Sequence, residues 1–172
     1  MADTAFMQAA AEKTITTAIV EDIRDIREGL TTLVNFTEGF ACNGSYRSME
    51  EAIPRIKGNV PDVLLSDIGL PGMNGIDGIR ILKELYPEMT VLMLTVYDDD
   101  ERIFDALCAG ASGYLLKRTA PAKLLENIRE AVEGTLAATG GEARDIQGGH
   151  VGHFAAELYS MQGHPSAFLV DM

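Results

Sequence analysis

Polar side chains that could carry out chemistry follow several short apolar segments of this sequence. They are Glu21 and Asp22 after ITTAIV (15–20), Asp67 after DVLLS (62–66), Thr95 at the end of TVLMLT (90–95) and Lys117 at the end of SGYLLK (112–117). Clustered carboxylates repel one another, and a divalent cation that prefers oxygen ligands, such as Mg²⁺, relieves that repulsion. A carboxylate can also attack phosphorus to form an acyl phosphate, whose oxygens a hydroxyl and an ammonium group can bind. The set therefore indicates magnesium-dependent phosphoryl chemistry at Asp67, where the following turn could offer the backbone carbonyl of Gly69 to the metal.

Each of these residues also has an ordinary structural explanation. Asp67 could end a strand by hydrogen-bonding to its own turn, because Pro, Gly and Asn residues follow it. Glu21 and Asp22 could cap the next helix, where the helix dipole favours carboxylates. Thr95 could be a β-branched strand residue and Lys117 a solvated strand end. Singly these explanations are the simpler ones, but five suitable residues at the ends of four strands are hard to obtain by chance.

The apolar segments alternate with segments of helical periodicity. Strands are expected at 15–20, 39–45, 62–66, 90–95 and 112–117, and helices over the apolar repeats at 23–34, 49–56, 76–85, 103–107 and 124–132. The second strand is the least typical because it has few β-branched residues, and the last helix is expected to stop at Gly134. This alternation predicts an α/β fold with a parallel sheet covered on both faces, and such sheets bind ligands beyond the carboxyl ends of their strands.

Composition limits the function further. The chain has 172 residues, 47% of them apolar, which suits one globular domain with a short tail. Its net charge of −12 argues against binding a nucleic-acid backbone. Cys42 and Cys108 form no CxxC motif and are expected to be reduced, core-type residues of a cytoplasmic protein. From its first residues we expect no signal peptide, and no apolar run reaches the ~18 residues of a membrane span.

Four motifs together resemble the receiver domain of response regulators, the phosphoacceptor part of two-component signalling. They are VED (20–22), LLSDIGLPGMNG (64–75), MLT (93–95) and GASGYLLK (110–117). The resemblance covers residues 15–134, with an N-terminal extension over 1–14 and a tail over 135–172. It implies a doubly wound five-stranded parallel sheet of the flavodoxin or CheY type, with strand order 2-1-3-4-5.

The resemblance also implies the roles of the acidic residues. Asp67 corresponds to the aspartate that accepts a phosphoryl group from a sensor histidine kinase. Asp22 and Asp67 correspond to direct Mg²⁺ ligands, Glu21 to a ligand that acts through water, and Gly69 to a carbonyl ligand. Such a domain is a signalling switch rather than a dedicated enzyme, and only self-phosphorylation from small donors and autodephosphorylation are expected of it.

The same resemblance assigns the switch residues. Thr95 and Lys117 correspond to the residues that bind phosphoryl oxygens, and Tyr114 to the aromatic whose rotation accompanies the movement of Thr95. Phosphorylation adds nearly two negative charges and would favour one of two pre-existing states of a dimerisation or effector face. A homodimer is therefore expected on phosphorylation.

Two local departures from the family pattern are visible. Arg118 follows Lys117 where proline is common, so a cis peptide bond there would be costly, and its geometry is left open. Val96 and Tyr97 follow Thr95 where a small residue is frequent. These two larger side chains are expected to shield the phosphoryl group from water.

Two function classes stay open. The segment GYLLKRTAPAKLLENIREAVEG (113–134) resembles receivers of the NarL/FixJ type, whose partner domain is a DNA-binding helix-turn-helix. The alternative is a magnesium-dependent hydrolase of small phosphorylated metabolites, which also uses an aspartate nucleophile. That class typically carries a second aspartate two residues later, where this chain has Gly69 and no acid for the leaving group.

The tail lacks a helix-turn-helix pattern. Residues 135–172 are rich in glycine and contain one basic residue, Arg144, so we expect no DNA binding by this chain alone. His150 and His153 in HVGH, with His164, could suggest a metal site, but glycines surround them and no cysteine accompanies them. A flexible extension is the simpler interpretation; a chain boundary, an altered reading frame or a partner-binding segment would each produce it.

Overall fold

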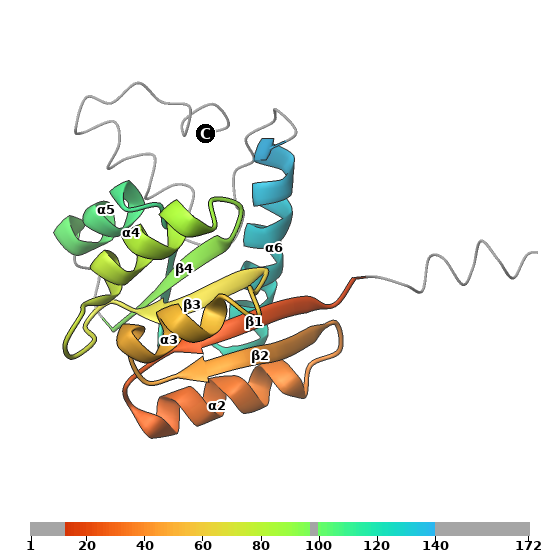
Figure 1. Cartoon of the computed structure of the whole chain (residues 1–172). Helices are drawn as coiled ribbons and strands as arrows, with labels where there is room; N and C mark the ends of the chain where they lie inside the picture. The colour runs from red at the N-terminus through yellow and green to blue at the C-terminus, as the bar shows by residue number, and fades with distance from the viewer. Residues whose placement is uncertain (1–12, 97–99, 140–172) are drawn as a thin grey trace, which may run out of the picture.

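The computed structural model describes residues 13–96 and 100–139 (Figure 1). One sheet of five parallel strands contains β1 (Ile15–Val20), β2 (Phe40–Tyr46), β3 (Val63–Asp67), β4 (Thr90–Thr95) and β5 (Gly113–Leu116). The helices are α2 (Arg24–Asn35), α3 (Met49–Ile56), α4 (Gly75–Leu85), α5 (Asp100–Cys108) and α6 (Pro121–Thr139). The strand order β2-β1-β3-β4-β5 confirms the predicted fold class and order. Tyr97, most of the N-terminal extension and the tail with its histidines lie outside the described residues.

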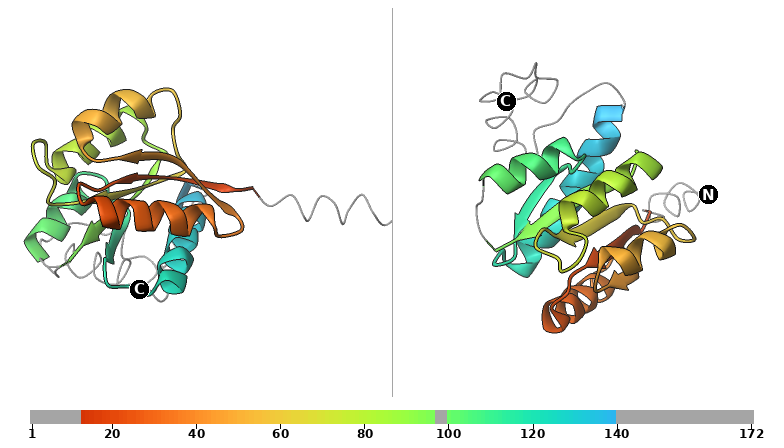
Figure 2. Two further views of the ribbon diagram at one scale, coloured as in Figure 1. Left: turned by 90° about the horizontal axis from the view of Figure 1, so that it is seen from below. Right: turned by 60° about the vertical axis from the view of Figure 1, so that its left-hand side comes forward.

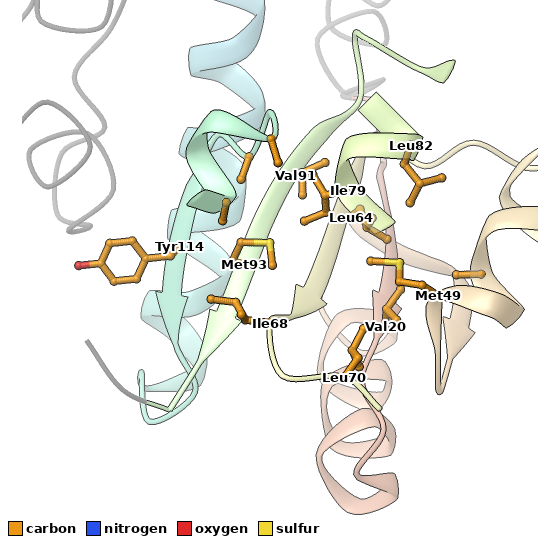
Figure 3. Packing of buried hydrophobic residues seen from close by; sticks show 14 of the residues in the cluster. Val20, Met49, Leu64, Ile68, Leu70, Ile79, Leu82, Val91, Met93 and Tyr114 are labelled. Carbon is orange, nitrogen blue, oxygen red and sulfur yellow. The ribbon is translucent and has the colours of Figure 1, made fainter. Parts of the chain in front are cut away.

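Helices cover both faces of the sheet, with α2 and α6 on one side and α3, α4 and α5 on the other (Figure 2). Alternation along each strand divides the core in two. Ile19, Leu65 and Leu94 belong to the cluster beneath α2 and α6. Val20 and Met93 belong to the larger cluster beneath the other three helices, part of which Figure 3 shows. Both faces of β3, β4 and β5 are buried, which explains why these strands read as nearly continuous apolar runs, whereas the edge strand β2 is mostly half-buried.

The edge strand β2 contains an irregularity that accounts for its atypical sequence. In its pairing with β1, Thr17 lies opposite Cys42 but Ala18 lies opposite Gly44, so Asn43 is the extra residue of a bulge. The Asn59 side chain donates to the Asn43 carbonyl oxygen at 3.0 Å. The Asn43 carbonyl, which the bulge leaves out of the β1–β2 ladder, therefore still accepts a hydrogen bond.

Two sequence-based expectations were wrong. Helix α6 does not stop at Gly134 but continues to Thr139. An internal glycine costs a helix only about 1 kcal/mol relative to alanine, and the following Leu and Ala residues favour the helix. The cysteines are not core residues, because Cys42 is half-buried and Cys108 is exposed on the last turn of α5; both are free thiols. Within the described part of the chain, no helix is long and apolar enough to span a membrane.

Lys83 joins the end of α4 to the turn before β4. Its Nζ donates to the Pro87 carbonyl at 2.6 Å and to the Met89 carbonyl at 2.8 Å. Burial lowers the pKa of this lysine. Its stem also lies so close to Gly110, which has a φ of +115°, that a Cβ at that position would be 2.8 Å from Lys83 Cγ.

We expect Lys83→Met to lower the free energy of unfolding by about 1–3 kcal/mol, because two carbonyl groups lose their donor while the apolar stem is retained. Urea unfolding followed by circular dichroism measures the change. Lys57→Met, at an exposed lysine after α3, is the matched control and should alter stability by less than about 0.5 kcal/mol. Equal stabilities of the two variants would show that the Lys83 hydrogen bonds do not contribute.

Candidate functional site

The predicted acidic residues meet at the carboxyl edge of the sheet. The Glu21 N–H donates to the Tyr46 carbonyl at 2.9 Å, which continues the β1–β2 pairing one residue beyond Val20. Asp67 is the last residue of β3, next to β1 in the sheet. Carboxylate oxygens of Glu21, Asp22 and Asp67 all lie within 4.8 Å of one another. Glu21 is buried, Asp67 is half-buried with its side chain 13% exposed, and Asp22 is exposed, so the cluster opens to solvent on the Asp22 side.

Lys117 contacts two of these carboxylates from the end of β5. Its Nζ lies 2.7 Å from Glu21 Oε2 and 3.3 Å from Asp67 Oδ2, and its side chain is only 11% exposed. The explanation of Lys117 as a solvated strand end is therefore wrong. Burial alone would lower the pKa of Lys117, but hydrogen bonding with Glu21 and the charges of Asp67 and Glu21 raise it. The ammonium group stays charged and partly balances the cluster.

The chemistry of the cluster fits a small divalent cation. Burial, and to a smaller extent the charge of Asp67, raise the pKa of Glu21 above its ordinary value, although the Lys117 contact acts in the opposite direction. The three carboxylates carry a charge of −3, and Lys117 offsets only one unit of it. An oxygen-rich, incompletely neutralised pocket that opens to water is suited to Mg²⁺, which retains several of its waters.

Arg27 supports the acidic pair from the first turns of α2. Its Nη1 donates to the Glu21 carbonyl at 2.8 Å and to the Asp22 carbonyl at 3.3 Å. The N-cap residue of α2 is Ile23, so the two acids precede the cap and do not occupy it. Glu21 Oε1 does accept the Ile23 N–H at 3.2 Å. These contacts fix the backbone between β1 and α2 and so help to orient the Glu21 and Asp22 carboxylates toward the acidic cluster.

The loop between β3 and α4 is held by contacts that need small residues. The Gly75 N–H donates to the Ile68 carbonyl at 3.0 Å, and a Cβ at Gly75 would lie 2.1 Å from the Asp67 carbonyl oxygen. Gly72 has a φ of +74°, and Glu50 of α3 accepts the neighbouring Met73 N–H at 3.3 Å.

Two further contacts in this loop orient α4 and Asp67. Asn74 caps α4 by accepting the Asp77 N–H at 2.9 Å. Asp67 also bonds its own turn, since Oδ1 accepts the Gly69 N–H at 3.4 Å, so the structural explanation of Asp67 holds beside its place in the cluster.

The predicted switch residues lie on the two neighbouring strands. Thr95 ends β4, is 7% exposed and pairs with Leu116, and its carbonyl accepts the Lys117 N–H at 2.9 Å. Tyr114, on β5, is buried and projects from the sheet away from Met93 (Figure 3). By strand alternation, Thr95 and Tyr114 lie on the face that α3, α4 and α5 cover.

The structure settles the geometry of the peptide bond that follows Lys117, which the sequence left open. The described residues include no cis peptide bond, so the bond between Lys117 and Arg118 is trans. Val96 is 54% exposed just beyond β4. Because Tyr97 lies outside the described residues, shielding of the phosphoryl group by these two side chains stays a prediction.

Sequence reasoning missed three residues that shape the site: Arg27, Glu50 and Gly75. Arg27 follows Asp22 by five positions, which places it where a helix beginning after the acidic pair turns back toward it. Glu50 gave no signal, because its partner lies 23 residues later in the chain. Gly75 could have been found, since a glycine at the first position of a helix is unusual unless a close backbone approach requires it.

The chain is thus a doubly wound α/β domain that carries an acidic cluster and a lysine at the carboxyl edge of its parallel sheet. Residues 17–129 match the response regulator receiver domain family, and the chain belongs to that family. Among solved structures, the fold is similar to a LuxR-family two-component response regulator from Aurantimonas sp. SI85-9A1, with a TM-score of 0.68, 25% identity and coverage of 88% of this chain and 100% of that one. It is also similar to a CheY-like receiver domain protein from Methanospirillum hungatei, with a TM-score of 0.67, 28% identity and coverage of 73% and 99%.

The curated relatives are transcriptional regulators. The chain is 41% identical over 100 residues to the transcriptional regulatory protein LnrK of Bacillus subtilis, covering 58% of this chain and 46% of LnrK. It is 34% identical over 116 residues to the DNA-binding transcriptional activator DevR/DosR of Mycobacterium tuberculosis, covering 67% and 54%. The chain thus spans about half the length of the curated relatives it matches. The Aurantimonas protein is described as a LuxR-family regulator, and nothing in these matches favours the hydrolase alternative.

Proposed function

We propose that this chain is a phosphorylation-controlled switch, in which Asp67 accepts a phosphoryl group from a sensor histidine kinase. One observation carries the proposal: carboxylate oxygens of the buried Glu21, the half-buried Asp67 and the exposed Asp22 lie within 4.8 Å of one another at the strand ends, and Lys117 contacts two of these residues. Membership of the receiver family supports the same role. As a switch, the chain would be a signalling domain and not a dedicated enzyme.

The transfer requires one bond exchange at phosphorus. An Asp67 carboxylate oxygen attacks the phosphorus atom, an O–P bond forms, and the P–N bond to the kinase histidine breaks; with acetyl phosphate, the leaving group is acetate. Asp22 and Asp67 would hold Mg²⁺ directly, with Glu21 acting through water and Gly69 through its carbonyl. The ion would supply positive charge to the transferring oxygens. Lys117, whose Nζ lies 3.3 Å from Asp67 Oδ2, would turn from that oxygen to bind a phosphoryl oxygen.

The readout would pass through Thr95 and Tyr114. Thr95 ends β4, next to β3, and would bind a second phosphoryl oxygen. Its movement would change the packing around Tyr114, which is buried in the cluster beneath α3, α4 and α5. An altered surface on this side would then favour a homodimer or an effector contact. By analogy with the relatives, DNA would be bound only by a further effector domain, and this chain, whose full sequence has a net charge of −12, would not bind DNA alone.

Incubation with acetyl phosphate and Mg²⁺, followed by intact-mass measurement, tests the proposal. We expect a gain of one phosphoryl group that is lost when EDTA is present from the start. A phosphohydrolase would instead release inorganic phosphate with turnover from small phosphorylated metabolites and leave the mass unchanged. An unchanged mass under all conditions would contradict the proposed function.

The two acids of VED should contribute unequally to magnesium affinity. Asp22→Asn replaces a proposed direct ligand and should weaken Mg²⁺ binding by about 100-fold or more, whereas Glu21→Gln should weaken it by only about tenfold. Isothermal titration calorimetry at neutral pH measures both. Asp25→Asn, at an exposed carboxylate in the first turn of α2, is the control and should bind as the wild type does. Equal affinities for all four proteins would contradict the proposed metal site.

A further inference from the structure

Arg102 of α5 lies beside the turn that carries the proposed phosphoacceptor. Its Nη1 is 4.0 Å from the place where a Cβ of residue 69 would be, but residue 69 is a glycine and leaves that place open. The Gly69 N–H in turn lies 3.4 Å from Asp67 Oδ1. The guanidinium group therefore approaches the Asp67 turn on the side where residue 69 has no side chain.

The charge of the pocket favours a second cation there. Three carboxylates and Lys117 give a net charge of −2 from −3 and +1. A phosphoryl group on Asp67 would make the pocket about one unit more negative, because a phosphorylated group carries about −1.5 to −2 in place of −1. Even with a divalent cation bound, the pocket would keep about one negative charge, which one guanidinium group would neutralise.

From this placement and charge we infer that Arg102 binds a phosphoryl oxygen of phosphorylated Asp67 and so stabilises the phosphorylated state. Guanidinium groups form charge-assisted hydrogen bonds to phosphate oxygens, and the planar fork of N–H donors suits this task better than a lysine. Arg102 would supply from α5 the contact that residue 69 cannot supply. The phosphorylated site would then be linked directly to α5 as well as through Thr95. The inference rests on the proposed function of Asp67.

Beryllofluoride, a stable mimic of the phosphoryl group, tests this inference on the whole chain with Mg²⁺ present. The affinity is measured by calorimetry for wild type, Arg102→Lys and Arg102→Gln. Loss of one charge-assisted hydrogen bond should weaken binding about tenfold in Arg102→Gln, with Arg102→Lys between it and wild type. Arg80→Gln, at an exposed arginine of α4 that pairs with Asp77, should bind as tightly as wild type.

A second measurement separates binding from folding. Thermal unfolding of each protein is measured without and with beryllofluoride, and we expect beryllofluoride to raise the unfolding temperature of Arg102→Gln by less than it raises that of wild type. Wild-type affinity in Arg102→Gln would overturn the inference while leaving the proposed function intact. If wild type neither binds beryllofluoride nor gains a phosphoryl group from acetyl phosphate, the proposed function fails and the inference fails with it.

Discussion

Asp67→Asn should abolish the gain of one phosphoryl group that wild type shows with acetyl phosphate and Mg²⁺. An amide nitrogen or oxygen is a far poorer nucleophile toward phosphorus than a carboxylate, and the substitution also removes one charge from the cluster that binds the cation. Because Asp67 lies within 4.8 Å of the other two acids, either loss alone should prevent the reaction. Intact-mass spectrometry after a short incubation measures the effect as complete loss of the phosphorylated species.

Asp105→Asn is the matched control, since Asp105 is an exposed carboxylate of α5. It should be phosphorylated as fully as wild type. Full labelling of Asp67→Asn would show that another side chain accepts the phosphoryl group, and peptide mapping would then identify it.

Gly75→Ala should lower the free energy of unfolding by about 3 kcal/mol, at the upper end of what overpacking costs. The added Cβ would lie 2.1 Å from the Asp67 carbonyl oxygen, a backbone atom that cannot turn aside as a flexible side chain can. The loop would have to move, which would also strain the 3.0 Å hydrogen bond from the Gly75 N–H to the Ile68 carbonyl. Since that loop carries Asp67, the rate of phosphorylation should fall as well.

Gly29→Ala is the informative comparison. Gly29 lies in α2 with no atom within 4 Å of the added methyl group, so alanine should stabilise the protein by about 0.5–1 kcal/mol through its higher helix propensity. Urea unfolding of both variants gives the two changes with opposite signs. A stability of Gly75→Ala equal to that of wild type would mean that the loop relaxes without cost and that its close approach to Asp67 is unimportant.

The meeting of the site residues was predictable because a parallel sheet brings the carboxyl ends of its strands to one edge. Glu21, Asp67 and Lys117 each follow an apolar segment in the sequence. Once the strand order is known, these positions at the strand ends are nearly sufficient to predict that the three residues lie close together. The contact of Lys117 with both acids is a matter of side-chain geometry and required the structure.

The errors have physical causes of a different kind. A glycine such as Gly134 can end a helix, but it does so only where the residues that follow it do not favour the helical conformation. Here they do favour it, and α6 continues for another turn. Cys108 has an apolar side chain, yet it faces outward because the buried positions of α5 are filled by Ile103, Ala106 and Leu107. Glu50 and Met73 come together only through tertiary folding, which no local pattern encodes.

The bulge at Asn43 has a consequence for how copies of this domain meet. An edge strand presents unpaired backbone groups that can recruit another strand, and bulged or short edge strands resist such recruitment. Here one edge strand, β2, is interrupted by the bulge, and the other, β5, has only four residues. Among the residues that the structure describes, neither edge offers a long flat template for continuing the sheet into a second molecule. At high concentration, association of folded copies should therefore proceed through helical surfaces, in a reversible way, and not through the edge-to-edge strand addition that leads to fibrous aggregates.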